Sequence, residues 1–110
     1  MVKTKQPLVQ SNNKGRLGVT MVADQYFEEV ANERNLNVTD GVIIDDVQDG
    51  SAAQYAGLIP NDVILKINNN SVSSTVDVRN TIAQTKAGEI LKMTIFRNGK
   101  TKNVDVTLKS

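Results

Sequence analysis

Two runs of alternating apolar and polar residues near the end of the chain restrict its fold more than any other feature. The runs are residues 90–97, ILKMTIFR, and residues 102–109, KNVDVTLK. The apolar positions of each run share one face: Leu91, Met93 and Ile95 in the first, and Val104, Val106 and Leu108 in the second. A period of two is typical of a strand with one buried face, and Asn98-Gly99 between the runs is a strong hairpin signal. The sequence therefore predicts an antiparallel β-hairpin that covers a core.

The chain before this hairpin alternates between short strands and helices. Strands are predicted at 17–22, 41–47 and 62–68, where β-branched and aliphatic residues gather. Helices are predicted at 24–35, 50–58 and 74–87, with N-caps at Asp24, Ser51 and Ser74. Gly57 is expected to end the second helix, and Gly88 lies just past the end of the third. Asp62 is expected to be a turn or cap residue. The predicted fold class is α+β, mainly β: a small, partly open antiparallel barrel or sandwich flanked by two to three helices.

Length and charge limit the chain to one small domain with few kinds of partner. The chain has 110 residues, which suits a single core. Residues 1–14 are expected to be a polar lead or linker, and residues 15–110 the domain. The net charge is +1 and only 4% of residues are aromatic, so we expect neither a nucleic acid nor an anionic membrane as partner. No apolar run is long enough to span a membrane.

The absence of two residue types limits the chemistry further. The chain has no histidine and no cysteine, which excludes a Ser-His-Asp triad, a Cys-His pair, and imidazole or thiolate metal sites. The acidic segment 45–49 lacks calcium-loop spacing. We therefore expect no metal, no cofactor and no enzymatic activity in this chain. A Ser-Lys dyad that uses Ser71, Ser73 or Ser74 remains an alternative.

Three segments resemble the PDZ family. Residues 50–69, GSAAQYAGLIPNDVILKINN, resemble its central signature, and residues 76–100, VDVRNTIAQTKAGEILKMTIFRNGK, resemble its closing helix and hairpin. The loop KGRLGV at 14–19 resembles its carboxylate-binding loop, with Lys14 where an arginine is usual and Val19 where an isoleucine is usual. The resemblance covers about residues 15–108. Because the loop opens the domain and a helix follows the first strand, the order of parts resembles the PDZ domains of bacterial HtrA/Deg-type serine proteases.

The resemblance implies a site at this loop. Gly15 and Gly18 can adopt positive φ, so the loop can direct several N–H groups at one anion, and Lys14 and Arg16 add positive potential. An edge strand after the loop can pair with an extended peptide, and one edge of the helix 74–87 walls the groove. The candidate peptide-binding and carboxylate-binding residues are Lys14, Gly15, Arg16, Leu17, Gly18, Val19, Thr20, Met21, Val76, Arg79 and Ile82.

The same resemblance implies the function. The chain is expected to bind extended peptides or unfolded-protein C-termini with an apolar last residue, by β-strand addition. It would be the non-catalytic domain of a serine endopeptidase, beside a parent protease domain in the periplasm or cell envelope of a bacterium, where it recruits substrates or regulates proteolysis in protein quality control. Two alternatives remain: a PDZ domain of a site-2 or C-terminal processing protease or of a secretion protein, or an assembly module that contacts neighbouring subunits.

Overall fold

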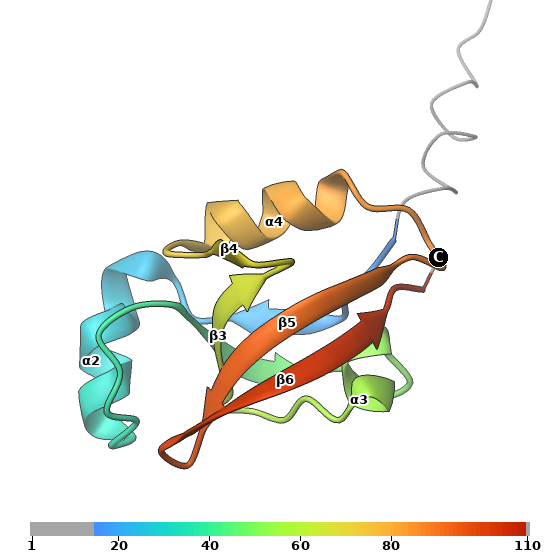
Figure 1. The fold of residues 1–110 in the computed structure, drawn as a ribbon. Helices are drawn as coiled ribbons and strands as arrows, with labels where there is room; N and C mark the ends of the chain where they lie inside the picture. Colours follow the sequence, from blue (N-terminus) through green and yellow to red (C-terminus); the bar gives the residue numbers. More distant parts are fainter. Residues whose placement is uncertain (1–14, 110) are drawn as a thin grey trace, which may run out of the picture.

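A single antiparallel sheet organises the molecule. The computed structural model describes residues 15–109, so the expected lead at 1–14 lies outside the described residues. The sheet order is β1-β2-β3-β5-β6, with β4 paired to β3 off this path. The strands are β1 Val19–Met21, β2 Val42–Val47, β3 Val63–Ile67, β4 Asn70–Ser71, β5 Ile90–Arg97 and β6 Lys100–Thr107 (Figure 1). β1 and β6 are the two edges of this path, so the sheet is not closed.

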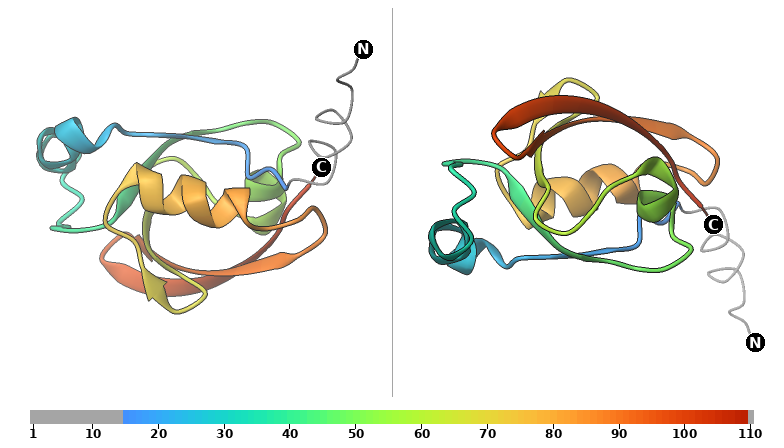
Figure 2. Two further views of the ribbon diagram at one scale, coloured as in Figure 1. Left: turned by 90° about the horizontal axis from the view of Figure 1, so that it is seen from above. Right: turned by 90° about the horizontal axis from the view of Figure 1, so that it is seen from below.

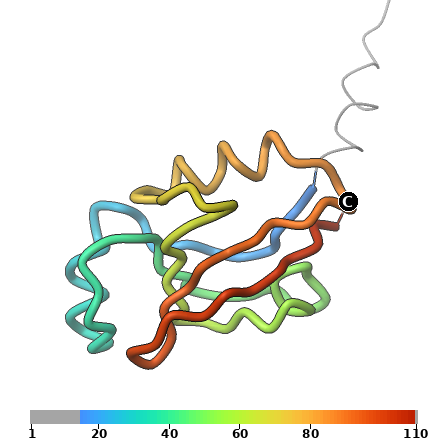
Figure 3. The backbone as a smooth tube through the Cα atoms, in the orientation of Figure 1, coloured from blue at the N-terminus to red at the C-terminus, as the bar shows by residue number. Residues whose placement is uncertain are grey.

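The sheet nevertheless curls until its two ends approach each other. Arg16, just before β1, exchanges two backbone hydrogen bonds with Lys109, just after β6, at N···O distances of 2.6 and 3.3 Å. The two ends of the described chain consequently lie side by side (Figure 3). The result is the predicted partly open, mainly β architecture.

The alternating apolar residues predicted for the first strand of the last hairpin are the residues that the structure buries. Leu91, Met93 and Ile95 are at most 1% exposed, and they meet residues of β2, β3 and β6 in one core. Asn98 and Gly99 have φ of 51° and 79°, as a two-residue hairpin turn requires. A smaller cluster of Ala31, Ile43 and Val63 lies beneath the first helix, with Phe27 packed against it.

Three α-helices and one 3-10 turn flank the sheet in the described chain. They are the 3-10 turn η1 Asp24–Tyr26, and the helices α2 Phe27–Glu33, α3 Ala52–Ala56 and α4 Thr75–Ala83. The caps predicted at Ser51 and Ser74 are confirmed, since each hydroxyl accepts the N–H of the residue three positions later. α4 ends at Ala83 rather than at residue 87, because Thr85 N–H bonds Ile82 O in a tighter turn. The Thr85 carbonyl therefore points outside the helix.

The predicted cap at Asp24 is wrong. The residue before η1 is Ala23, and no side chain caps that turn. The Asp24 carboxylate instead accepts the N–H of Thr75 at 2.9 Å and the Thr75 hydroxyl at 3.2 Å. It thus caps α4, a helix far away in sequence, and ties that helix to the end of β1.

Asp62 does more than the expected turn residue. Its carboxylate accepts Ile59 N–H at 3.0 Å, as a turn cap would. It is also 1% exposed and pairs with Arg97 through two hydrogen bonds of 2.6 and 2.7 Å. The bonds from Arg97 to Asp62 raise the pKa of the guanidinium above its usual value. The same bonds hold the 59–62 turn against β5.

Candidate functional site

A groove runs between β1 and α4. It has a volume of about 540 Å³ and is lined by Gly15, Arg16, Leu17, Gly18, Val19, Met21, Gln48, Arg79, Ile82 and Ala83. Seen from above, β1 and α4 run side by side along its length (Figure 2, left). The structure therefore brings together the loop, the edge strand and one side of the helix that the sequence predicted as a site.

The agreement with the predicted residues is incomplete. Gln48 and Ala83 line the groove but were not predicted. Thr20 is exposed and pairs with Asp46, and Val76 is 52% exposed. Neither is among the residues that line the groove. Lys14 lies outside the described residues. Ala83 could have been predicted from the sequence, because it lies next to Ile82 on α4. Gln48 could not, because it reaches the site only through the pairing of β2 with β1.

Hydrogen bonds fix both ends of the groove. At one end Gly15 N–H donates to Thr85 O at 3.1 Å, just after α4. At the other end Asp24, just after β1, caps α4 at Thr75. α4 therefore runs antiparallel to β1, and the helical wall between residues 75 and 83 is about 12 Å long at 1.5 Å per residue.

At each of the two loop glycines, a different neighbour leaves no room for a side chain. Gly18 has φ of +84°, and a Cβ there would lie 2.3 Å from Cβ of Ser51. A Cβ at Gly15 would lie 2.5 Å from Cδ1 of Leu108. The loop is thus pressed against both the N-cap of α3 and the end of the last strand.

Not every N–H of the loop can serve a ligand. Those of Gly15 and Arg16 donate to Thr85 O and Lys109 O inside the fold. The N–H groups of Leu17 and Gly18 have no acceptor within residues 15–109. These two adjacent donors are the ones that can bind an anion.

The edge of β1 contributes further polar groups. Val19 lies opposite Val47, and Gln48 N–H donates to Gly18 O. In an antiparallel ladder this places Val19 at a pair that exchanges no hydrogen bonds. Its N–H and C=O therefore point away from β2, toward the open edge and the groove.

The groove is lined by apolar side chains and by two positively charged ones. Val19, Met21, Ile82 and Ala83 supply aliphatic surface, and the charged lining residues are Arg16 and Arg79, with no carboxylate among them. Hydrogen bonds from Ser73 and Ser74 lower the pKa of Asp77, with the Ser73 N–H contributing most. That charge lies at the first turn of α4 and not among the lining residues. An extended chain with an anionic end and apolar side chains fits these features.

Other kinds of site find no support in the described part of the chain. Within residues 15–109 no three acidic side chains are grouped so as to hold a metal ion. None of the helices there is long and apolar enough to cross a membrane.

Comparison with known proteins identifies the family. Residues 15–108 match the family model of the PDZ domain. The periplasmic pH-dependent serine endoprotease DegQ of Escherichia coli K12 is 33% identical over 95 residues, which cover 86% of this chain and 20% of that protein. The serine protease Do-like HtrA of Lactococcus lactis is 36% identical over 72 residues, 66% of this chain and 18% of that protein. The chain thus spans about a fifth of the length of the curated relatives it matches.

Solved structures agree with this assignment. The HtrA-type protease AlgW with a decapeptide superposes with a TM-score of 0.75 at 33% identity, over 88% of this chain and 29% of that one. The PDZ domain of HtrA3 bound to the phage-derived ligand FGRWV gives a TM-score of 0.74 over 87% of this chain and 86% of that one; its 16% identity supports the fold alone. The chain therefore belongs to the PDZ domain family, and its resemblance to the PDZ domains of HtrA/Deg-type serine proteases is confirmed.

Proposed function

We propose that this chain is the peptide-binding module of an HtrA/Deg-type serine protease and captures extended peptides through a free C-terminus. The observation that carries the proposal is the pair of adjacent N–H groups at Leu17 and Gly18, which have no acceptor within residues 15–109 and belong to residues that line the groove beside an edge strand. An edge strand offers main-chain hydrogen bonds to any extended peptide, and the side chains of alternate residues carry the preference.

In this mode the peptide lies antiparallel to β1. Its terminal carboxylate accepts hydrogen bonds from Leu17 and Gly18, with Arg16 nearby. Its last side chain packs on Val19, Ile82 and Ala83, which can desolvate an aliphatic or aromatic group and offer no partner to a charge. We therefore expect ligands with an apolar last residue.

The role within a longer protein follows from the relatives. Their names describe serine proteases, several of them periplasmic. The chain has neither histidine nor cysteine, so we assign it a non-catalytic part: recruiting substrates to a parent protease domain, or regulating that domain, in the periplasm or cell envelope.

One titration tests the proposal. A peptide with an apolar last residue is measured as its free acid and as its C-terminal amide. Charge-assisted bonds contribute about 1.5–3 kcal/mol each, so the amide is expected to bind about ten- to a hundredfold more weakly. Equal affinities would overturn C-terminal capture and favour an internal segment or a neighbouring subunit as occupant of the groove.

A further inference from the structure

We propose that the open edge of β6 is a separate strand-addition site, which takes an extended acidic segment whose carboxylates lie two residues apart. β6 and β1 are opposite edges of the sheet path, so this site uses neither the glycine loop nor a free C-terminus. The inference therefore goes beyond the proposed function and does not depend on it.

The register of the last hairpin determines which backbone groups β6 leaves unpaired. Arg97 lies opposite Lys100 across a two-residue turn, so these two residues exchange hydrogen bonds and every second residue of β6 after Lys100 does the same with β5. Lys109 shows where the other residues point, because its N–H and C=O bond Arg16 on the side away from β5. The residues of β6 whose N–H and C=O point to that open side are Thr101, Asn103, Asp105 and Thr107.

The half of β6 nearest the turn is the accessible part of this edge. Thr101, Asn103 and Asp105 are exposed, and no strand of the described chain pairs with β6 on that side. α3 lies beside the other end of β6, whereas the tip of the hairpin extends away from α3 (Figure 1). Each of the three exposed residues therefore offers one N–H and one C=O to an incoming strand.

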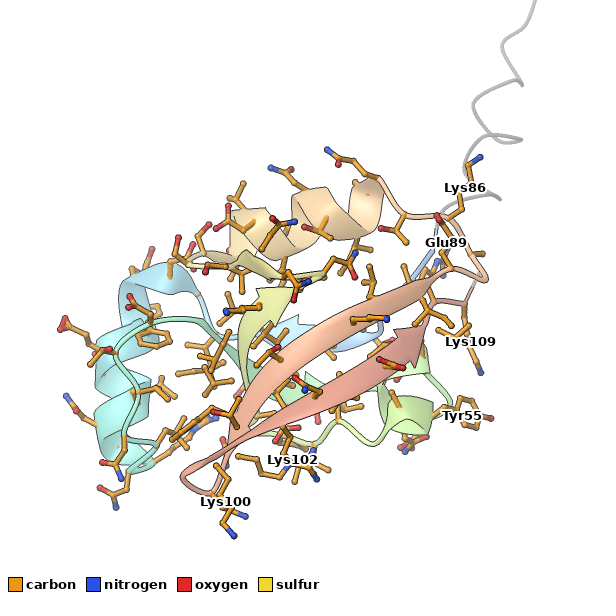
Figure 4. All side chains as sticks on the ribbon, viewed as in Figure 1. Tyr55, Lys86, Glu89, Lys100, Lys102 and Lys109 are labelled. Atoms are coloured by element: carbon orange, nitrogen blue, oxygen red, sulfur yellow. The ribbon has the colours of Figure 1, made fainter. Side chains whose placement is uncertain are left out.

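Two lysines give this part of the edge its charge. Lys100 and Lys102 are exposed and share one face of β6, and neither forms an ion pair within residues 15–109. Both lie near the tip of the hairpin, on the side of β6 away from α4 (Figure 4). Asp105 is on the opposite face, directly across from Lys92 of β5, so a cation already faces that carboxylate. The face with Lys100 and Lys102 has positive charge that nothing in the described chain neutralises.

These charges select the occupant of the edge. Because Lys100 and Lys102 bond β5, the residues opposite them on an added antiparallel strand form non-hydrogen-bonded pairs, in which opposed side chains are closest. Opposite charges in such pairs stabilise a sheet and like charges destabilise it. Lysines on an edge strand also oppose pairing with a second copy of the same edge. The complementary partner is therefore an extended segment with Glu or Asp at two alternate positions.

The test uses a peptide of β-branched residues, blocked at both termini, with Glu, Gln or Lys at two alternate positions. The blocked C-terminus removes the carboxylate that capture at the glycine loop requires. Because the two ion pairs are exposed, the Glu peptide is expected to bind about two- to tenfold more tightly than the Gln peptide at low salt. High salt should reduce this preference, and the Lys peptide should bind most weakly. NMR titration should shift the amide signals of Thr101 and Asn103 and leave that of Val19 unchanged.

Substitutions assign the preference to the two lysines and the binding to the edge. Replacing both lysines with Glu, Lys100→Glu with Lys102→Glu, should make the Lys peptide the preferred one. Lys66→Glu is the matched control, because Lys66 is exposed on β3, which pairs with β4 and β5 on its two sides; it should keep the Glu preference. Asn103→Pro removes an N–H of the open edge, where proline is tolerated, and should abolish binding of the blocked peptide without changing the affinity of the groove for a free-acid peptide.

The outcomes separate this site from the groove. If the Glu and Gln peptides shift Thr101 and Asn103 with equal affinity, selection by charge is wrong. If the signals that shift are those of Val19 and Met21, the blocked peptide occupies the groove and the β6 site is overturned. An absence of shifts at millimolar peptide also overturns it. None of these results changes the comparison of free acid with amide that tests C-terminal capture.

Discussion

At the residue scale, the two loop glycines are required because of what lies next to them. Gly18 combines a left-handed backbone with a Cβ position 2.3 Å from Ser51, and Gly15 has a Cβ position 2.5 Å from Leu108. The sequence shows that glycines occupy these places but not which neighbour excludes a side chain. A substitution in this loop is therefore expected to change the packing of α3 or of the segment just after β6, in addition to the proposed peptide binding.

A matched pair of variants separates collision from backbone strain. Gly18→Ala is expected to lower the free energy of unfolding more than Gly50→Ala, because Gly50 has a similar φ of +75° and no atom within 4 Å of a Cβ there. Strain alone costs about 1–2 kcal/mol, and the collision with Ser51 should add at least about 1 kcal/mol. Urea unfolding measures both. Equal losses would mean that the Ser51 contact relaxes without cost.

Local signals explain which features the sequence could predict. The caps at Ser51 and Ser74 and the turn at Asn98-Gly99 depend on residues within four positions of each other, so a short window of sequence contains all the partners. The contacts of Asp24 with Thr75 and of Asp62 with Arg97 join residues 51 and 35 positions apart. Each carboxylate also suited a local role as a cap or turn residue, so the sequence did not reveal its distant partner.

At the scale of elements, the carboxylate of Asp24 is one of two ties between α4 and the chain around β1, the other being the bond from Gly15 to Thr85. It accepts two hydrogen bonds from Thr75, so it acts as the N-terminal anion of the helix and as a tie across the end of the groove. Asp77 bonds Ser73 at the same end of α4 but makes no contact with the β1 side. The two acids therefore share a capping role, and only one of them also sets the groove.

This difference can be measured. Asp24→Ala and Asp77→Ala should each cost about 0.5–2 kcal/mol of stability, as the loss of a cap does. Only Asp24→Ala should also weaken peptide binding, by about three- to tenfold, because the wall that Arg79 and Ile82 occupy is no longer fixed. Urea unfolding measures the stability of each variant. Peptide titration under conditions where both variants are folded measures the affinity. Equal affinities in the two variants would show that the tie does not position the wall.

At the scale of the whole molecule, the binding loop is built from both ends of the domain. Arg16 pairs with Lys109 through the backbone, and Gly15 lies against Leu108. The loop that opens the domain therefore depends on the strand that closes it.

Two core truncations test whether this closure serves binding or stability alone. Leu108 and Leu91 are 2% and 1% exposed and belong to the same core, so Leu108→Ala and Leu91→Ala should each lower the free energy of unfolding by about 2–5 kcal/mol. Leu108 also supports Gly15, whereas Leu91 lies near the start of β5 and pairs with Val106. Peptide affinity, measured at a temperature where both variants are folded, should therefore fall only in Leu108→Ala, and hydrogen exchange at the amides of Gly15 and Arg16 should accelerate more in that variant. If Leu91→Ala weakens binding to the same extent, the loop depends on the core as a whole and not on its contact with the last strand.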